Sequence, residues 1–178
     1  AVQAARIQAR QAQGEALIDF MLNDLRARLE PLGRLDVLDE VGDQAVAYFA
    51  SLPASEYTDA ELASRSQALY QIGNVRLSGG SSVEARAAFA ESLRLARTLA
   101  DRAPEDRDRL FGLSQSEFWV GYASWLAGDL AEADLHFQAY LDIAERLVAM
   151  EPDNLDYRLE LAYAWSNVGS CLLYTSDA

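Results

Sequence analysis

The sequence predicts an all-α protein in which antiparallel helical hairpins repeat along the chain and stack on one another. The first indication is composition: Ala, Leu, Arg, Glu and Asp predominate, and the 178 residues include only 10 Gly and 4 Pro, as is typical of helical proteins. The second is an internal repeat. GSSVEARAAF begins at Gly80, and GDLAEADLHF, which shares its glycine, glutamate, alanine and phenylalanine positions, begins 48 residues later at Gly128. One hairpin cannot bury both of its apolar faces, so repeated hairpins are expected to stack.

The same shift of 48 residues aligns further positions along the chain. Gly73, Gly121 and Gly169 fall in register, and so do Pro104 and Pro152. Chance does not maintain one register over three glycines and two prolines, so we interpret the chain as a true repeat. Further matches are Leu93 with Leu141, Ala96 with Ala144, and Leu99 with Leu147.

The N-terminal part, residues 1–57, is predicted to hold a long helix over about 2–29 and a second helix over about 35–50. Ala45 and Phe49 in the second helix have the alanine-to-phenylalanine spacing of the repeated stretches. These two helices are therefore interpreted as a divergent first pair.

Residues 58–104 form the first repeat unit and are predicted to fold as two helices. Thr58–Glu61 reads TDAE, a capping box whose threonine and glutamate satisfy free backbone N–H groups. Gly79–Gly80 ends this helix, and Ser81–Glu84 is predicted to be a second capping box. Pro104 separates the unit from the next. The expected buried faces contain Leu62, Leu69, Ile72 and Val75 on the first helix, and Val83, Ala85, Ala88, Phe89, Leu93, Ala96 and Leu99 on the second.

Residues 105–152 form the second unit, built in the same way. A helix of about 20 residues is expected to end at Gly128. Asp129–Glu132 caps the next helix, which runs to about Met150. Residues 153–170 are interpreted as the first helix of a third unit that is cut short. The apolar side chains of the first helix of the second unit are Leu110, Leu113, Phe118, Val120, Tyr122 and Trp125.

Small residues lie where the two helices of a pair are expected to cross. Gly121 and Ala133 allow close approach of the backbones, and Phe137 is expected to fill the space between neighbouring pairs. With Gly128, these residues resemble the tetratricopeptide repeat, over about residues 58–170. The resemblance implies a right-handed α-solenoid whose first helices line a concave groove, although the period here is 48 residues and the family's is about 34. The corresponding residues of the first unit are Gly73, Gly80, Ala85 and Phe89.

Two longer stretches, LIDFMLNDLRARLEPLGRLDVLD and FWVGYASWLAGDLAEA, also resemble a repeat region of large bacterial signalling proteins. This resemblance implies a cytoplasmic location, or a soluble region of a parent that a membrane helix anchors. Arg6 and Arg10 would suit a segment leaving a membrane, or simply a surface helix. The last residues, 171–178, resemble a translated adapter tail of metagenomic reading frames, so the native sequence is expected to stop near Ser170.

Composition excludes several classes of function. The net charge of −13 argues against nucleic acid, because no basic surface is available to replace phosphate counterions. All 15 basic residues are arginine, so a Schiff-base lysine and a P-loop lysine are impossible. No apolar run is long enough to insert into a bilayer. We expect no enzyme activity, no cofactor and no metal.

The single histidine and the acidic clusters are the remaining candidates for chemistry. His136 and Glu132 lie four residues apart and could hold a metal or simply contact each other on a helix surface; a third ligand is not evident. Acidic residues at 36–40 and 105–108 could form a glycosidase-type pair. Their positions at loops and helix starts favour capping instead.

An amphipathic aromatic stripe on the first helices is the most suggestive feature of the sequence. Such a surface suits an extended peptide or a helix, but the same side chains could merely pack against neighbouring helices. We therefore expect a protein-binding scaffold module, with self-association or intramolecular docking as the alternative and an enzyme as a remote third. The expected groove residues are Gln67, Tyr70, Asn74, Gln115, Phe118, Tyr122, Tyr163 and Ser166.

Overall fold

The computed structural model describes residues 57–176 and the single positions 31, 44 and 47. Residues 57–176 are helical and contain no strand, so the all-α prediction is confirmed for them. The two helices expected before residue 57, with Ala45 and Phe49, and the acidic cluster at 36–40 lie outside the described residues. The described helices are α4 (Asp59–Ser78), α5 (Ser82–Arg102), α6 (Arg107–Leu126), α7 (Leu130–Met150) and α8 (Leu155–Ser176).

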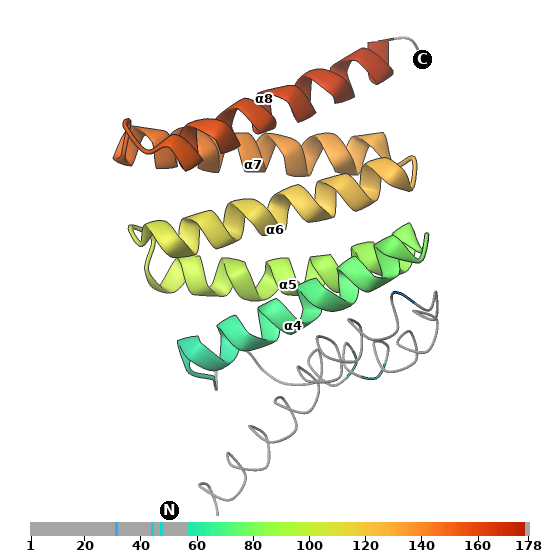
Figure 1. Ribbon diagram of the computed structural model, residues 1–178, viewed down its shortest axis with the longest axis horizontal. Coiled ribbons are helices and arrows are strands. Elements are labelled where there is room, and N and C mark those ends of the chain that lie inside the picture. Colours follow the sequence, from blue (N-terminus) through green and yellow to red (C-terminus); the bar gives the residue numbers. More distant parts are fainter. Residues whose placement is uncertain (1–30, 32–43, 45–46, 48–56, 177–178) are drawn as a thin grey trace, which may run out of the picture.

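The five helices are stacked in chain order. Each helix contacts the next one along the chain, and Figure 1 shows them one above another, from α4 to α8, with alternating directions. Helices α4 and α6 each have 20 residues, and α5 and α7 each have 21. The two units predicted from the sequence are therefore two helical hairpins of matching dimensions.

The predicted N-cap of α4 is present, and so are the glycines predicted to end α4 and α6. The Thr58 hydroxyl accepts from the backbone N–H of Glu61, and the Glu61 carboxylate accepts from the backbone N–H of Thr58, which completes the capping box. Gly80 and Gly128 have φ values of 85° and 81°, the left-handed conformation that glycine adopts at little cost. Around Gly128, its own N–H donates to the Trp125 carbonyl and the next N–H donates to the Ser124 carbonyl, which forms a Schellman motif.

The predicted capping box at Ser81 was wrong. Ser81 is the N-cap of α5, but its side chain makes no capping hydrogen bond. Asp129 occupies the equivalent position before α7 with nearly the same backbone angles, and its carboxylate accepts from the N–H of Glu132 at 3.3 Å. In this tight turn the longer aspartate side chain reaches the amide that the serine hydroxyl does not reach.

Each hairpin is closed by a phenylalanine ring packed on a glycine. A Cβ atom placed at Gly73 would lie 2.4 Å from the Phe89 ring, and one placed at Gly121 would lie 2.8 Å from the Phe137 ring. Because these glycines have no side chain, α4 can lie close to α5, and α6 close to α7. One predicted core residue, Val83, is 58% exposed, because it lies in the first turn of α5, beside the loop rather than opposite α4.

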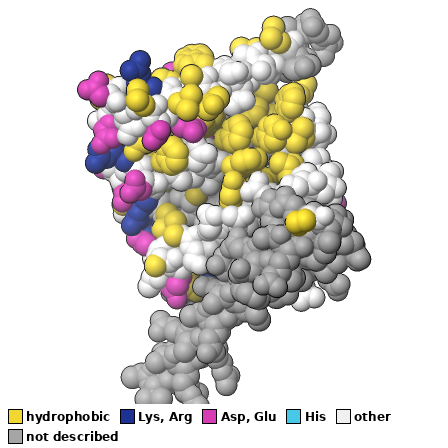
Figure 2. Space-filling view, in the orientation of Figure 1, with side chains coloured by type: hydrophobic (Ala, Val, Ile, Leu, Met, Phe, Trp, Pro, Cys, Tyr) yellow, Lys and Arg dark blue, Asp and Glu magenta, His cyan; other side chains and the backbone are white. Residues whose placement is uncertain are grey.

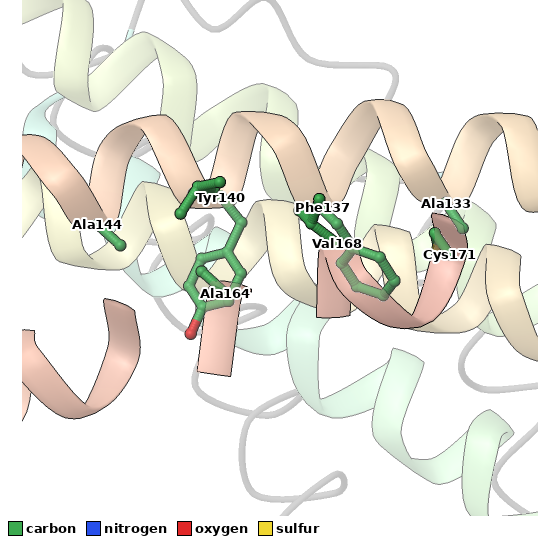
Figure 3. Packing of buried hydrophobic residues seen from close by; sticks show 8 residues of the cluster. Ala133, Phe137, Tyr140, Ala144, Ala164, Val168 and Cys171 are labelled. Atoms are coloured by element: carbon green, nitrogen blue, oxygen red, sulfur yellow. The ribbon is translucent and has the colours of Figure 1, made fainter. Parts of the chain in front are cut away.

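Helix α8 packs its inner face on α7 and runs further than predicted. Figure 3 shows Ala164 beside Tyr140, Val168 beside Phe137 and Cys171 beside Ala133, and these residues of α7 and α8 belong to one buried cluster. Phe137 therefore also fills space between neighbouring hairpins, as expected. The helix does not stop near Ser170 but continues to Ser176, because the apolar spacing continues and Cys171 is only 1% exposed.

Candidate functional site

A groove of about 540 Å³ lies between α4 and α6, with α5 beneath it. Both flanking helices pack on α5, and the groove is the space left between their outward edges. The floor is formed by Ser92, Ala96 and Leu99 of α5. Ser66 of α4 joins the floor, because its hydroxyl lies 2.9 Å from the Ser92 hydroxyl and ties the two helices together.

The walls of the groove combine amide, aromatic and bare backbone surfaces. Gln67 and Tyr70 project from α4, and Gln115 and Trp119 project from α6. On α6, three residues before Gln115, Gly112 leaves the wall without a side chain, and a Cβ placed there would meet no atom within 4 Å. This combination offers apolar area together with hydrogen-bonding groups, as ligand grooves do.

One end of the groove is bordered by an ion-pair cluster centred on Arg109. The Arg109 guanidinium donates to Asp59 at 2.7 Å and to the Leu99 carbonyl at 3.0 Å, and so links α6 to α4 and α5. Arg102 also donates to Asp59 at 2.7 Å. These hydrogen bonds from Arg102 and Arg109 lower the pKa of the Asp59 carboxyl. Figure 2 shows charged side chains along the edge where α4, α6 and α8 begin.

Aromatic rings border the other end. Tyr70 and Trp119 meet edge-to-face, with ring centroids 5.6 Å apart, and Trp119 stacks on Phe89 at 5.6 Å. Trp119 joins α6 to the first hairpin through these contacts, and the sequence prediction missed it. The sequence could have indicated Trp119, because it lies four residues after Gln115 and therefore on the same face of the helix. The prediction chose the adjacent face, which contains Phe118.

The other predicted groove residues lie elsewhere. Asn74 is half-buried on α4 and does not line the groove. Phe118 and Tyr122 pack against the cluster between α6, α7 and α8. Tyr163, which is 54% exposed, and Ser166 lie on α8. The structure thus brings together three of the eight predicted residues: Gln67, Tyr70 and Gln115.

Phe118, Tyr122 and Trp125 form a second aromatic surface on α6. The Phe118 and Tyr122 rings stack at 5.8 Å, and Tyr122 stacks on Trp125 at 6.2 Å. Figure 2 shows hydrophobic side chains gathered in one area over the C-terminal half of α6. All three rings are half-buried and support the packing of α8, so packing is at least part of their role.

The second hairpin also holds a buried pair, Glu117 and His136, at the position of an apolar contact in the first. The Glu117 side chain is 4% exposed and accepts from Arg97 at 2.7 Å and from His136 Nδ1 at 2.7 Å. Glu132 lies 3.2 Å from His136 Nε2. Burial lowers the pKa of the His136 imidazole, but its hydrogen bonds and Coulomb attraction to the two glutamates outweigh burial and raise the pKa above its usual value.

These contacts give both ring nitrogens of His136 a hydrogen-bonding partner within the fold. The predicted Glu132–His136 contact is present, but the imidazole is 7% exposed and both of its nitrogens face carboxylates. Within residues 57–176, no group of three or more His, Cys, Asp or Glu side chains could hold a metal ion. In the acidic cluster at 105–108, Asp106 caps α6 by accepting from the N–H of Arg109, as the capping interpretation predicted.

Gln115 is positioned by a polar contact with α8. Its amide donates to the Glu160 carboxylate at 2.8 Å, and the same carboxylate accepts from the Tyr140 hydroxyl. Burial and the neighbouring Glu160 raise the pKa of Tyr140, so the phenol stays protonated and keeps donating. The second wall of the groove is therefore braced by α7 and α8.

No family model and no curated protein matches the chain. In the part of the chain that the structure describes, none of the helices has both the length and the apolar character needed to cross a bilayer.

Proposed function

We propose that this protein is a non-enzymatic interaction module that binds an extended peptide segment in the groove between α4 and α6. The observation that carries the proposal is the composition of the walls. Tyr70 and Trp119 offer apolar area with polar edges, Gln67 and Gln115 offer amides, and Gly112 leaves room for a ligand side chain. Peptide-binding surfaces combine aromatic anchors with a few oriented polar groups in this way.

The charges around the groove favour a ligand segment with basic residues. Arg109 is engaged by Asp59 and Asp106, whereas Asp108 is exposed on the groove lining. The whole chain carries a net charge of −13, which attracts cationic segments and speeds their encounter. The groove thus combines the exposed Asp108 carboxylate at one end with aromatic rings at the other.

The wider architecture that we propose is a right-handed solenoid of the tetratricopeptide-like kind. Two hairpins of equal helix lengths, each with a glycine–phenylalanine contact at the same register, support this assignment. In this proposal the module is a scaffold region of a larger bacterial signalling protein, and its partners are protein segments rather than nucleic acid.

A peptide-display selection against the purified chain tests this function. Selected peptides should bind the wild-type chain and lose binding to Gly112→Leu, because the added side chain would fill the groove from an open position. Tyr70→Ala should also weaken binding. The circular dichroism spectrum should stay helical and the melting temperature should not fall for Gly112→Leu, since leucine is a better helix former than glycine and its Cβ meets open space.

Gly169→Leu is the matched control, because it also adds leucine at an open helical glycine but on α8, away from the groove. Peptides that bind Gly112→Leu as tightly as the wild type would refute the groove as the binding site. A selection that yields no peptide with saturable binding would refute peptide binding itself.

A further inference from the structure

The space between α6 and α8 is the repeat equivalent of the groove between α4 and α6, and a carboxylate lies in it. Glu160 of α8 accepts a hydrogen bond from the Gln115 amide of α6 at 2.8 Å and another from the Tyr140 hydroxyl of α7. Three helices therefore meet at this one side chain. The second inter-hairpin space thus contains, from the chain itself, a group that the first space lacks.

The corresponding position in the groove carries no side chain. Under the shift of 48 residues, three residues that line the groove correspond to these three: Gly112 to Glu160, Gln67 to Gln115, and Ser92 to Tyr140. A Cβ at Gly112 would meet open space, and the serine side chain is much shorter than the tyrosine. The amide donor is therefore kept in the groove, whereas the carboxylate that it would bind is absent.

The groove wall is prepared for an acidic group at this position. The Gln67 side chain is exposed, and no hydrogen bond engages its amide within the residues that the structure describes. Arg109 also lines the groove, three residues before Gly112 on the same face of α6, and adds a positive charge. A hydrogen bond between an amide and a carboxylate is stronger than one between two neutral groups.

We propose that the peptide ligand of the groove carries an acidic side chain that lies beside Gly112 and accepts a hydrogen bond from the Gln67 amide. This inference rests on the proposed function and specifies the chemistry of the ligand. The basic residue of the ligand pairs with Asp108, which lies four residues before Gly112 and therefore about 6 Å away along the helix axis. In an extended peptide, side chains two residues apart lie on one face, roughly 7 Å from each other. The acidic and basic residues are therefore expected two positions apart.

Gly112→Glu tests the position of the carboxylate without any ligand. In the full chain the introduced side chain should reproduce the contact that Glu160 makes with Gln115, so the Gln67 side-chain amide signals should shift downfield in NMR spectra. Gln67→Ala identifies these signals by removing them. Gly112→Leu is the matched control, because it adds a side chain at the same open position without an acceptor. Equal Gln67 signals in Gly112→Glu and Gly112→Leu would overturn the proposal.

Peptides from the display selection test the ligand itself. Selected peptides should share an acidic residue, and replacing that glutamate by glutamine in one of them should weaken binding at least roughly tenfold in titration calorimetry. Gln67→Ala should weaken binding of the acidic peptide by a similar factor. The same variant should leave the affinity of the glutamine peptide unchanged, because the two substitutions remove one shared hydrogen bond.

The outcomes separate this inference from the proposed function. Selected peptides without an acidic residue, or equal affinities for the acidic and glutamine peptides, would overturn the inference and leave the groove as a peptide site. Binding that depends on the acidic residue but is unaffected by Gln67→Ala would overturn its placement beside Gly112. A selection that yields no peptide would refute the proposed function, and this inference would fall with it.

Discussion

The ring of Phe137 occupies the space where a side chain at Gly121 would lie: a Cβ placed on that glycine would be 2.8 Å from two ring carbons and 3.2 Å from the Cβ of His136. The distance between α6 and α7 thus depends on the absence of one methyl group. Gly73 and Phe89 repeat the relationship in the first hairpin, so one packing device fixes the geometry of both.

Gly121→Leu should destabilise the fold by about 1–3 kcal/mol or more, because the leucine overpacks the α6–α7 contact. Urea unfolding followed by circular dichroism measures the free energy of unfolding. The same substitution at Gly169, whose Cβ position is open, should cause no loss. Equal losses at the two sites would contradict the glycine–phenylalanine argument.

The free energy of unfolding should decrease as the pH rises through neutrality. The pKa of His136 is raised in the folded chain, so folding favours the protonated imidazole. This stabilisation is complete below the unfolded pKa of about 6.5 and is lost as the pH rises through the folded pKa. His136 is the single histidine, and urea titrations from pH 5.5 to 8.5 should show a slope that His136→Gln abolishes. An unchanged slope in that variant would exclude His136 as its origin.

Glu117→Leu should destabilise the second hairpin, and adding His136→Ala should recover much of the loss. The single change leaves the buried His136 without its Glu117 acceptor, a cost of about 1–3 kcal/mol. The double change recreates the Leu69 and Ala88 environment of the first hairpin and removes the unpaired group. Thermal melting of the wild type and the three variants of this cycle gives the coupling energy. A double variant less stable than Glu117→Leu alone would show that the two hairpins do not share this geometry.

Thr58→Ala should lower the free energy of unfolding by about 0.5–2 kcal/mol, because it removes the side chain that caps α4. Ser81→Ala should have a smaller effect, since the Ser81 side chain makes no capping hydrogen bond. Chemical denaturation of the two variants compares them directly. A larger loss for Ser81→Ala would indicate that its hydroxyl does cap α5 in solution.

Groove residues were harder to predict than helices. Gln67, Tyr70 and Gln115 were found because they stand on the outward face of the first helices. Trp119 was missed and Phe118 was misplaced, because one residue along a helix rotates a side chain by about 100°. Choosing between them required the angle at which α6 crosses its neighbours, and local sequence does not carry that angle.

The sequence by itself determined the number, length and ends of the helices between residues 58 and 150, together with the register of the two hairpins. These features arise from interactions over a few residues, such as the Thr58 cap and the left-handed Gly80 and Gly128. Only the tertiary structure decided which side chains become partners across helices: Glu117 with His136, and Tyr70 with Trp119. Those contacts depend on how closely two backbones approach and at what angle, and both result from the packing of all the helices together.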